Sequence, residues 1–511
     1  MKTLSVEQTR LLDAKTIEEA GIPGETLMER AGVGAGREIL AFTERLLPWK
    51  VRRFVLLAGK GNNGGDAYVV ARFLVEHANA ETAVFSTCPI GELKGDALLN
   101  AHRLPAETAL SEGVAPNFRD GDLIIDGLLG TGAKGAPREP YAEWIEMLNA
   151  SDLPVVSLDI PSGLDGDTGE TTGVAVNADM TVTMAFPKTG LLLARGPELA
   201  GPLRVIDIGI PAAFAEKTDS TFETTTAADV APLLSRRPFD AHKNSLGKVL
   251  VVGGSGEYPG APILAAEAAA RAGAGFVTVA VPESAEIPPP PNARHLVFKR
   301  LPDGGKGVFS RESRDTLAEL AEKSDAIAIG PGLTADGSVA EATQLLLEMG
   351  KTIILDADAL NLVAEGALKI PRKPKAGIAI TPHLGEAKRL AEGLGMDIDS
   401  GKIDAAKKIA AETAATTLLK GPRTIIATPD GRVALNSTGS PALATAGSGD
   451  VLTGIATAYA AAGIPLFDAL RAAAFIHGLA AELGPFGQRG LVADDLPALV
   501  AKAAKSISPY A

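Results

Sequence analysis

The sequence predicts an α/β protein of two domains, each built on a parallel sheet covered by helices. The chain has 511 residues, which is more than one hydrophobic core usually organises. Short runs of Val, Ile and Leu without polar alternation recur along it, as expected of strands buried on both faces. Helical patterns between these runs are long enough for the crossover connections of a parallel sheet.

The apolar runs fall into two series. The first comprises RFVLLAG, TAVFS, DLIIDG, PVVSLD, MTVTMA and LRVIDI, and the second comprises GKVLVVG, FVTVAV, DAIAIG, TIILDA, GIAIT, TTLLK and RTIIAT. A Thr-rich segment without a clear period lies between them. We therefore predict domains at residues 1–215 and 236–511, joined by a linker at 216–235.

Charge and cysteine content exclude several classes of protein. The chain carries 49 Lys and Arg against 62 Asp and Glu, a net charge of -13, so it lacks the basic footprint of a nucleic-acid binder. No run approaches the roughly 18 apolar residues of a membrane span, and the charged N-terminus lacks the pattern of a secretory signal. The single Cys88 fits a reducing compartment, so we predict a cytoplasmic protein without nucleic-acid or membrane partners.

A glycine loop, GKGNNGGD, follows the first predicted strand at residues 59–66. It matches neither the P-loop nor the dinucleotide-binding pattern, and its glycines alone fit a tight strand-to-helix turn. Such a turn does not require Asn62, Asn63 and Asp66, however. Their carboxamide and carboxylate groups can bind hydroxyls, amides or a hard cation.

Two later strand ends carry similar chemistry. Asp126 precedes a second glycine loop, and Asp159 and Ser162 lie beside a Pro-Ser-Gly turn. Ligands of open parallel sheets bind at the carboxyl ends of the strands, where Asn63, Asp126 and Ser162 would offer oxygens suited to a hard cation. Alternatively, Asp126 and Asp159 simply cap the turns that follow them.

The sharpest feature of the second half is TAGSGDVLTG at residues 445–454. Small residues lead here into an apolar helix, whose free N–H groups and dipole can stabilise a phosphoryl group in transfer. Asp450 is placed to accept the proton of an attacking hydroxyl. By itself, however, Gly-Asp at a helix start can also be an ordinary cap.

Four motifs in the first half occur in the order of a known family. LMERAG (27–32), GKGNNGGD (59–66), DGLLGTG (126–132) and SLDIPSGLDGDTG (157–169) resemble the YjeF N-terminal family, the NAD(P)H-hydrate epimerases. The resemblance covers nearly all of residues 1–215. It implies a Rossmann-like three-layer αβα domain that interconverts the R and S epimers of NAD(P)HX, the hydrated form of NADH or NADPH.

The resemblance also implies roles for individual residues. Potassium would be held by Asn63, Asp126 and Ser162, and Asp159 is our candidate for proton transfer at the C6 hydroxyl. Ala67 stands where the family usually has Gly, a mild change at a helix start. The residues expected to contact NAD(P)HX are Asn62, Asn63, Gly64, Gly65, Asp66, Gly130, Thr131, Gly132, Ala133, Lys134, Gly135, Ala136 and Asp159.

The second half resembles the ribokinase-like fold, and specifically the NAD(P)H-hydrate dehydratases. The motifs that carry this are HKNSLGKVLVVGGSGEYPGAP, GPGL (330–333), LDADALN (355–361), TPHLGE (381–386), LKGPRT (419–424) and GSGD, from about residue 239 to 496. The family uses Mg²⁺ and ADP or ATP to phosphorylate the hydrate's hydroxyl, after which phosphate leaves. The resemblance thus implies a lyase in a ribokinase-like αβα domain.

This second resemblance assigns Asp450 as the base and Gly447 to Gly449 as the anion hole. The residues expected at the hydrate are Ala261, Gly332, His383 and Asp450. Those expected at ADP or AMP are Lys420, Gly421, Pro422, Arg423, Thr424 and Gly449.

Several points stay open at the level of sequence. His383 can equally hydrogen-bond a loop carbonyl, and Asp356 and Asp358 can bind Mg²⁺ or cap a turn. Neither the choice of ADP or ATP nor a preference between NADHX and NADPHX is visible. A homo-oligomer is expected from the family alone.

The sequence thus favours a fused, multifunctional repair enzyme whose first domain epimerises NAD(P)HX and whose second dehydrates the S form. One alternative is a ribokinase-like kinase of a small alcohol or vitamin precursor, fused to a nucleotide-binding module. Another is an RNA-associated scaffold, which the net charge of -13 and the polar strand ends disfavour.

Overall fold

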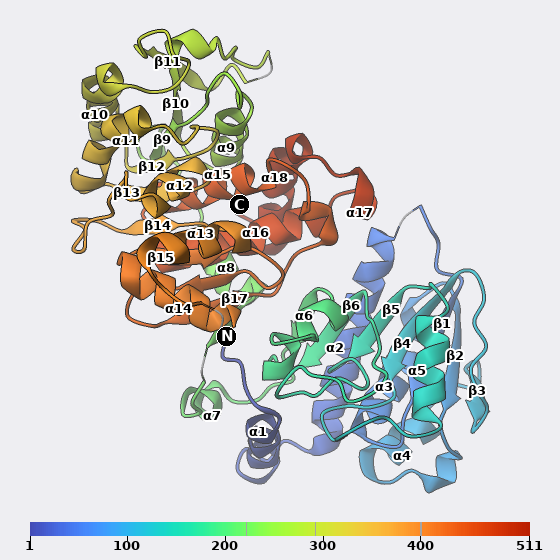
Figure 1. Cartoon of the computed structure of the whole chain (residues 1–511). Helices are drawn as coiled ribbons and strands as arrows, with labels where there is room; N and C mark the ends of the chain where they lie inside the picture. Colours follow the sequence, from blue (N-terminus) through green and yellow to red (C-terminus); the bar gives the residue numbers. More distant parts are fainter. Residues whose placement is uncertain (47, 221, 292, 399–400) are drawn as a thin grey trace. The chain divides into compact units, whose positions relative to one another are not determined.

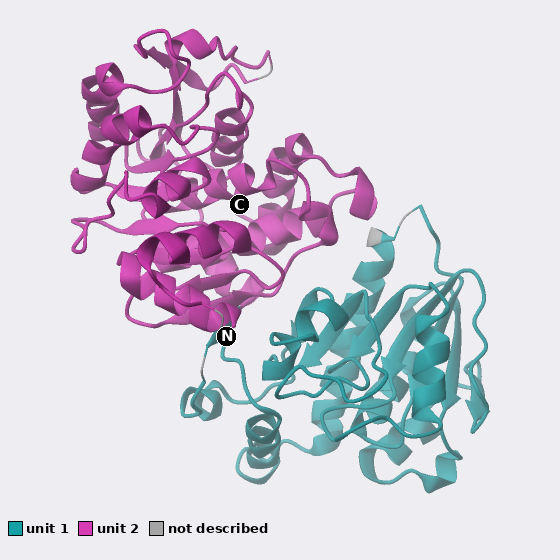
Figure 2. Cartoon of the chain, in the orientation of Figure 1, with its two compact units in different colours: residues 1–224 teal, residues 225–511 magenta. Residues whose placement is uncertain are grey.

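The computed structural model describes the chain except for residues 47, 221, 292, 399 and 400. It divides into two compact units, Met1–Thr224 and Thr225–Ala511 (Figure 2). Each unit is an α/β structure around its own sheet, which confirms the predicted fold class.

The first unit contains a seven-stranded sheet in the order β3-β2-β1-β4-β5-β6-β7, in which all paired strands are parallel. The strand order reverses between β1 and β4, which creates the switch point where open α/β sheets bind ligands. The strands are β1 (Arg53–Ala58), β2 (Glu81–Ser86), β3 (Ala109–Glu112), β4 (Asp122–Gly127), β5 (Val155–Leu158), β6 (Met180–Met184) and β7 (Leu203–Ile206).

Helices cover both faces of this sheet (Figure 1). Side chains of α2 and α3 pack with Phe54 and Leu56 on one face, and Trp144 and Ile145 of α5 pack with Val55 on the other. The helices are α1 (Val6–Glu18), α2 (Gly24–Arg45), α3 (Asn62–His77), α4 (Gly95–His102), α5 (Tyr141–Asn149), α6 (Gly196–Leu199) and α7 (Ala212–Glu216), with short 3-10 turns η1 (Ile90–Glu92) and η2 (Thr189–Leu191).

The second unit contains a ten-stranded sheet in the order β11-β10-β9-β12-β13-β14-β15-β16-β17-β8. Its strands are parallel from β11 to β15, whereas β15, β16 and β17 pair antiparallel. The strands are β8 (Glu223–Thr225), β9 (Lys248–Val252), β10 (Phe276–Pro282), β11 (Val297–Leu301), β12 (Ala326–Ile329), β13 (Thr352–Leu355), β14 (Ile378–Ile380), β15 (Thr416–Leu419), β16 (Ile425–Ala427) and β17 (Val433–Asn436).

Alanine-rich helices form one layer over this second sheet. Gly454 of α15 lies so close to α9 that a Cβ atom there would be 2.0 Å from the Ala265 carbonyl oxygen. Helices α15, α16 and α18 share one core with Ile354, Leu418 and Ile426 of the sheet. The helices are α8 (Ala227–Val230), α9 (Ala261–Arg271), α10 (Arg314–Glu322), α11 (Gly337–Thr343), α12 (Asp358–Ala364), α13 (Leu384–Leu394), α14 (Lys402–Thr413), α15 (Ser448–Ala461), α16 (Leu466–Glu482), α17 (Gly487–Gly490) and α18 (Leu496–Ile507).

The 3-10 turns of the second unit are η3 (Ala231–Leu233), η4 (Glu283–Ala285), η5 (Arg311–Ser313), η6 (Gln344–Glu348), η7 (Pro441–Leu443) and η8 (Ala493–Asp495).

The structure refines the sequence-based organisation in two places. The segment 216–235 that was expected to link the domains carries β8, α8 and η3, and the chain passes between the units within β8. Residue 221 of this segment lies outside the described residues. The second sheet is also not parallel throughout, because β15, β16 and β17 are joined by short loops that can only reverse the chain.

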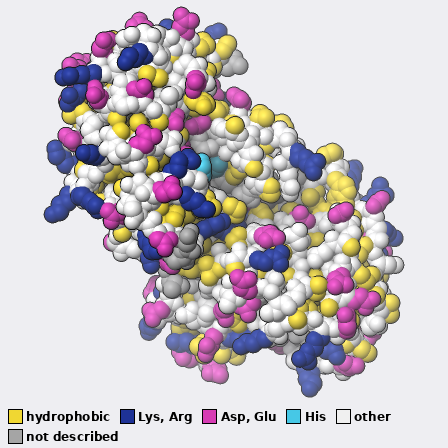
Figure 3. Space-filling model, viewed as in Figure 1, with side chains coloured by type: hydrophobic (Ala, Val, Ile, Leu, Met, Phe, Trp, Pro, Cys, Tyr) yellow, Lys and Arg dark blue, Asp and Glu magenta, His cyan; other side chains and the backbone are white. Residues whose placement is uncertain are grey.

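The distribution of charged side chains and the hydropathy of the helices bear on two expectations from the sequence: no basic patch and no membrane span. On the face shown in Figure 3, the described Lys and Arg side chains are interspersed with Asp and Glu rather than gathered into one patch. Among the described residues, no helix combines the length and apolarity needed to cross a membrane.

Candidate functional site

The first candidate site lies at the carboxyl ends of β1, β4 and β5. The loop after β1 turns directly into α3, which begins at Asn62 with Gly61 as its N-cap. The turn requires glycine at position 64, because a Cβ atom there would lie 1.9 Å from the Gly59 carbonyl oxygen. This close approach places Asn63 and Asp66 in the first turns of a buried helix.

Asp126 joins the β4 and β5 ends of this site. Its fully buried carboxylate accepts hydrogen bonds from the hydroxyls of Ser157 (2.8 Å) and Ser162 (2.6 Å). It also accepts bonds from the backbone N–H groups of Ser162 (2.9 Å) and Leu128 (3.2 Å). Burial raises the pKa of Asp126, an effect that these hydrogen bonds oppose.

Asn63 completes the set of oxygens predicted to hold potassium. Its Nδ2 donates to the Leu129 carbonyl (3.0 Å), which Ser162 Oγ also approaches (3.2 Å). Asn63 Oδ1 is buried and has no hydrogen-bond partner among the described residues. Buried polar atoms are rarely left unpaired, so this free oxygen beside a hydroxyl and a carboxylate fits a hard cation such as K⁺.

Asp159 is paired with a lysine that the motifs did not reveal. Asp159 has a left-handed backbone (φ 63°) and accepts hydrogen bonds from Lys188 Nζ and the Met184 N–H (3.2 Å). Lys188 is only 1% exposed and also donates to Thr183 Oγ1 (3.2 Å) and the Met184 carbonyl (2.9 Å). A buried ammonium held by three acceptors fixes the position of the Asp159 carboxylate.

The second glycine loop lies at the exposed edge of this site. Residues 132–136 are exposed, and the Arg10 guanidinium of α1 donates to the Thr131 carbonyl (2.9 Å). Gly130 packs against Asn63, since a Cβ atom at position 130 would lie 3.1 Å from Asn63 Cβ. The structure thus brings both glycine loops together at one edge of the sheet.

The second candidate site lies at the carboxyl ends of β9, β12, β13, β14 and β15. Gly332 follows β12 in a left-handed conformation (φ 67°), and a Cβ atom there would lie 2.6 Å from the Tyr258 carbonyl oxygen and 3.1 Å from Ala261 Cβ. Two of the residues predicted to bind the hydrate, Ala261 and Gly332, therefore adjoin, next to the exposed ring of Tyr258.

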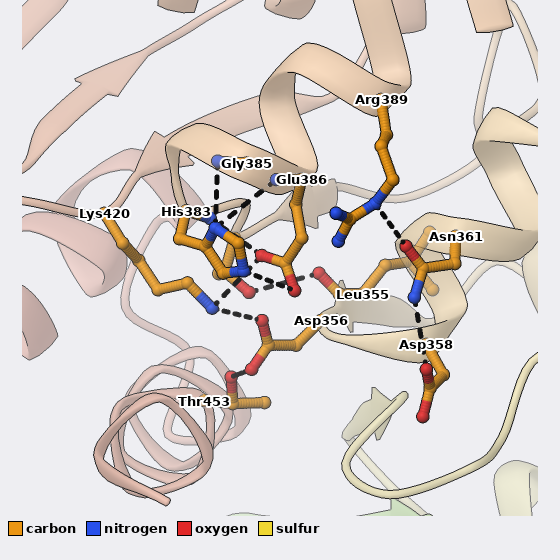
Figure 4. A network of polar contacts seen from close by, with 11 residues as sticks. Leu355, Asp356, Asp358, Asn361, His383, Gly385, Glu386, Arg389, Lys420 and Thr453 are labelled. Carbon is orange, nitrogen blue, oxygen red and sulfur yellow. Dashed lines mark hydrogen bonds and ion pairs between the residues drawn. The ribbon is translucent and has the colours of Figure 1, made fainter. Parts of the chain in front are cut away.

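A lysine-centred network forms the middle of the second site (Figure 4). Lys420 Nζ, at the end of β15, donates to Asp356 Oδ1 (2.7 Å) at the end of β13. Thr453 Oγ1 of α15 donates to the other Asp356 oxygen (2.6 Å). Burial alone would lower the pKa of Lys420, but the charges of Asp356 and Glu386 outweigh it and raise that pKa. Lys420 is therefore a stable cation within the site.

His383 caps α13 and binds Glu386 within the same network. Its Nδ1 accepts the N–H groups of Gly385 (3.0 Å) and Glu386 (3.3 Å), so it does not hydrogen-bond a loop carbonyl through that atom. Glu386 in turn accepts the His383 N–H (2.7 Å) and lies 3.7 Å from Lys420 Nζ. The imidazole is 54% exposed, and its other nitrogen, Nε2, lies 3.6 Å from Glu386 Oε1.

Asp450 lies in the first turn of α15, after Gly447 as N-cap in a left-handed conformation (φ 89°). Burial, followed by the charge of Asp356, raises the pKa of Asp450 to about 8 despite the opposing charge of Lys420. A Cβ atom at Gly449 would lie 3.3 Å from Lys420 Nζ, so the ammonium faces the start of the helix. The site thus combines a base, a cation and free helix N–H groups.

Other residues of the predicted nucleotide site have structural contacts. Arg423 is buried with a left-handed backbone (φ 52°), and its Nη1 donates to the Ser437 carbonyl (2.9 Å). Thr424 Oγ1 donates to the Gly421 carbonyl (3.1 Å). Asp358 accepts hydrogen bonds from the Thr334 N–H (3.0 Å) and Asn361 Nδ2 (3.1 Å).

The acidic pair after β13 is therefore occupied by protein groups. Asp356 holds Lys420, and Asp358 braces the loop after β12. Among the described residues, no group of three or more His, Cys, Asp or Glu side chains is placed to hold a metal ion.

Family models match both halves of the chain. A model described as YjeF-related protein N-terminus matches residues 24–190, and one described as NAD(P)H-hydrate dehydratase matches residues 249–501. The bifunctional NAD(P)H-hydrate repair enzyme of Salinibacter ruber is 39% identical over 96% of this chain and 94% of its own length. Those of Moorella thermoacetica (38%; 95% and 93%) and Thermofilum pendens (36%; 99% and 97%) are similarly close. The chain belongs to the family of bifunctional NAD(P)H-hydrate repair enzymes.

Comparison with solved structures bears on the fold. A ribokinase-like superfamily protein from Enterococcus faecalis V583 matches with a TM-score of 0.50 and 24% identity, over 57% of this chain and 98% of its own. This likeness shows a ribokinase-like fold in the chain. The ADP/ATP-dependent NAD(P)H-hydrate dehydratase from Bacillus subtilis matches with a TM-score of 0.48 and 31% identity, over 56% and 99%.

The sequence of the present chain did not suggest roles for four polar residues that the structure places in the two sites. Glu386 and Thr453 lie inside quoted motifs, but only the fold shows that they surround Asp356 and Lys420. Lys188 follows a buried strand, the same signal that singled out Asp126, and could have been found by it. Asp13 lies on α1, far from the motifs in sequence, and gave no such signal.

Proposed function

We propose that the first unit interconverts the C6 epimers of NADHX and NADPHX and that the second unit dehydrates the S epimer with ADP or ATP. The observation that carries this is membership of the bifunctional repair family over nearly the whole chain. The geometry supports it, since each unit gathers the predicted residues at the carboxyl ends of its strands.

In the first unit, the hydrated nicotinamide would lie against α3 and the strand ends, with the pyrophosphate on the exposed glycine loop. Asp159 would accept the proton of the C6 hydroxyl, because it is a carboxylate held in place by Lys188. Asn63, Asp126 and Ser162 would hold K⁺, which when bound supplies positive charge beside the nucleotide. The unpaired Asn63 Oδ1 supports this assignment.

In the second unit, Asp450 would take the proton of the C6 hydroxyl group while the hydroxyl oxygen attacks the terminal phosphoryl group of the nucleotide. The N–H groups at Gly447 to Gly449 and the Lys420 ammonium would stabilise the charge on the phosphoryl oxygens. The C6–O bond then breaks, phosphate leaves with the electron pair, and the N1 lone pair forms an iminium. Loss of a C5 proton restores the dihydronicotinamide.

The nucleotide contacts follow from the same arrangement. Lys420 would bind the phosphates rather than the base, because its Nζ faces Gly449 and not the surface. Backbone groups of Gly421 to Thr424 would contact the remainder of the ADP or ATP. Mg²⁺ would bind through the phosphates, since Asp356 is already paired.

A product assay tests the proposal. The protein is incubated with mixed NADHX epimers, K⁺, Mg²⁺ and either ADP or ATP while the absorbance of reduced nicotinamide is followed. Recovery with release of free phosphate is expected. A stable phosphate ester would instead indicate a kinase of a small alcohol, and no recovery with either donor would refute the proposed activity.

The proposal also includes a cytoplasmic location and a homo-oligomeric state. The single cysteine, Cys88, is buried and unpaired, which suits a reducing cytoplasm. A homo-oligomer is expected by analogy with the family, and light scattering of the purified chain would test it.

A further inference from the structure

Two carboxyl groups in the first unit have no role in the mechanism above. Asp66 of α3 is only 9% exposed, and Asp13 of α1 has a buried Oδ1 atom. Neither carboxyl group has a hydrogen-bond or ion-pair partner among the described residues. Buried carboxyl groups are normally paired, so an unpaired one at the edge of a ligand site calls for a functional explanation.

Both carboxyl groups lie within electrostatic range of the Lys188–Asp159 ion pair. The charged groups that act on Asp66 are Asp159, Lys188 and Asp13, which come from the loops after β5 and β6 and from α1. The same Lys188 and Asp159 act on Asp13. The candidate site therefore contains one carboxylate fixed by an ammonium and two carboxyl groups without a counter-ion.

Burial changes the protonation of both unpaired carboxyl groups in the same direction. Burial, reinforced by the charge of Asp159, raises the pKa of Asp66 well above its usual value. Burial also raises the pKa of Asp13, to about 6. Asp66 thus keeps its proton at a pH where an ordinary aspartate has lost it, next to an ion-paired carboxylate. A protonated carboxyl group near a carboxylate that an ammonium holds in place can serve as the acid while that carboxylate serves as the base.

We propose that Asp66 is the proton donor of the epimerisation, acting with Asp159 as the acceptor and Lys188 as the positioning residue of Asp159. This inference rests on the epimerase function proposed for the first unit. Asp66 is favoured over Asp13 because it is more deeply buried and follows Asn62 to Gly65 directly on the first turns of α3.

The reaction balances with these two groups alone. Asp159 takes the hydroxyl proton, the C6–O bond becomes a carbonyl, and the C6–N1 bond breaks with its electron pair going to N1. Asp66 donates its proton to N1. Rotation about the C5–C6 bond presents the other face of the aldehyde, and the same steps in reverse close the ring and return both protons.

The decisive variant is Asp66→Asn in the full chain. The rate at which purified R-NADPHX approaches the epimer mixture is measured by chromatography without added nucleotide, so that dehydration does not occur. General acid catalysis typically contributes about 100-fold or more, so kcat should fall at least about 100-fold with little change in KM. The amide has the shape of the neutral carboxyl group and can fill its place without donating a proton.

Asp13→Asn is the matched control, because it removes the other unpaired carboxyl group in range of the same ion pair. It should change kcat by less than about 10-fold. Loss of activity in Asp13→Asn with a normal rate in Asp66→Asn would overturn the proposal, and so would normal rates in both. Lys188→Met should lower kcat with little change in KM, and Lys188→Arg should recover part of the rate because its guanidinium can still hold the Asp159 carboxylate.

Two further measurements test the role of Asp66 separately from the folding of the variant. They also distinguish it from the epimerase function itself. A urea-unfolding profile of Asp66→Asn that matches those of wild type and Asp13→Asn shows that the first unit of the variant is folded. The wild-type rate should also fall with rising pH as Asp66 ionises, and a profile without that alkaline fall overturns the proposal without any variant. If the wild-type chain does not epimerise at all, the epimerase function itself is refuted.

Discussion

At the scale of single residues, both candidate sites pair a lysine with an aspartate at a strand end, and one partner of each pair is buried. Lys188 holds Asp159 in the first unit, and Lys420 holds Asp356 in the second. In each site another aspartate, Asp66 or Asp450, is left without such a partner and has a raised pKa. Breaking a buried ion pair is costly, so the lysines fix geometry while the unpaired aspartates remain free to exchange protons.

The raised pKa of Asp450 predicts the pH dependence of dehydration. Only the ionised carboxylate can accept the hydroxyl proton, so kcat/KM for S-NADPHX should rise with pH, with its midpoint near pH 8. Asp450→Asn should lower kcat by about 100-fold or more and leave no such rise. Steady-state rates between pH 5 and 9 test this, and a flat wild-type profile would contradict the role of Asp450 as base.

The same shift predicts an effect on stability. Because the folded-state pKa of Asp450 lies above its ordinary value of 3.8, the folded chain binds more protons than the unfolded one between about pH 4 and 8. The free energy of unfolding therefore falls across this range as pH rises. Asp450→Asn removes the contribution, so its stability relative to wild type should increase from pH 5 to pH 8.

Denaturant unfolding at pH 5 and pH 8 measures this difference. Asp404 is an exposed aspartate at the start of α14, so Asp404→Asn serves as the control and should show no comparable change between the two pH values. Equal pH dependence in wild type and Asp450→Asn would mean that Asp450 titrates normally.

At the scale of elements, the start of α3 is fixed by one glycine of its loop. A Cβ atom at Gly64 would meet the Gly59 carbonyl oxygen at 1.9 Å, whereas one at Gly61 would meet nothing within 4 Å. Gly64→Ala should therefore displace Asn63 and Asp66, lower epimerase activity at least about 10-fold and destabilise the chain by about 1 to 3 kcal/mol. Gly61→Ala should change both by much less.

Epimerisation rates and the midpoints of urea unfolding of the two variants test whether the turn requires glycine at position 64. Equal effects of Gly61→Ala and Gly64→Ala would show that the turn tolerates a side chain at either position. Dehydratase activity should be unaffected in both variants, since α15 and its N–H groups belong to the other unit.

Much of this element-level architecture was predictable because the central strands are buried on both faces. Strands such as β1 and β4 appear as continuous apolar runs, and their polar ends correctly indicated one edge of each sheet. Strands β3, β8, β11 and β17 were missed. The first three lie at sheet edges and are exposed or very short, whereas β17 is a buried strand of only four residues. Asp13 reaches the first site only through tertiary folding, which no local pattern encodes.

At the scale of the whole molecule, the chain combines two units that act on epimers of one compound. Each unit has its own sheet and its own set of strand-end residues. The S epimer made by the first unit is also the substrate of the second. If it passes through solution, the two activities need not reside in the same chain.

Complementation between two inactive chains tests this. Asp159→Asn, once shown to lack epimerase activity, should convert only the S fraction of an NADPHX mixture with nucleotide, and Asp450→Asn should convert none. An equimolar mixture of the two should carry the conversion to completion, because S-NADPHX formed on one chain can diffuse to the other. Nicotinamide absorbance at the end point measures it. A mixture that stops at the S fraction would show that the epimer must be passed on within one chain.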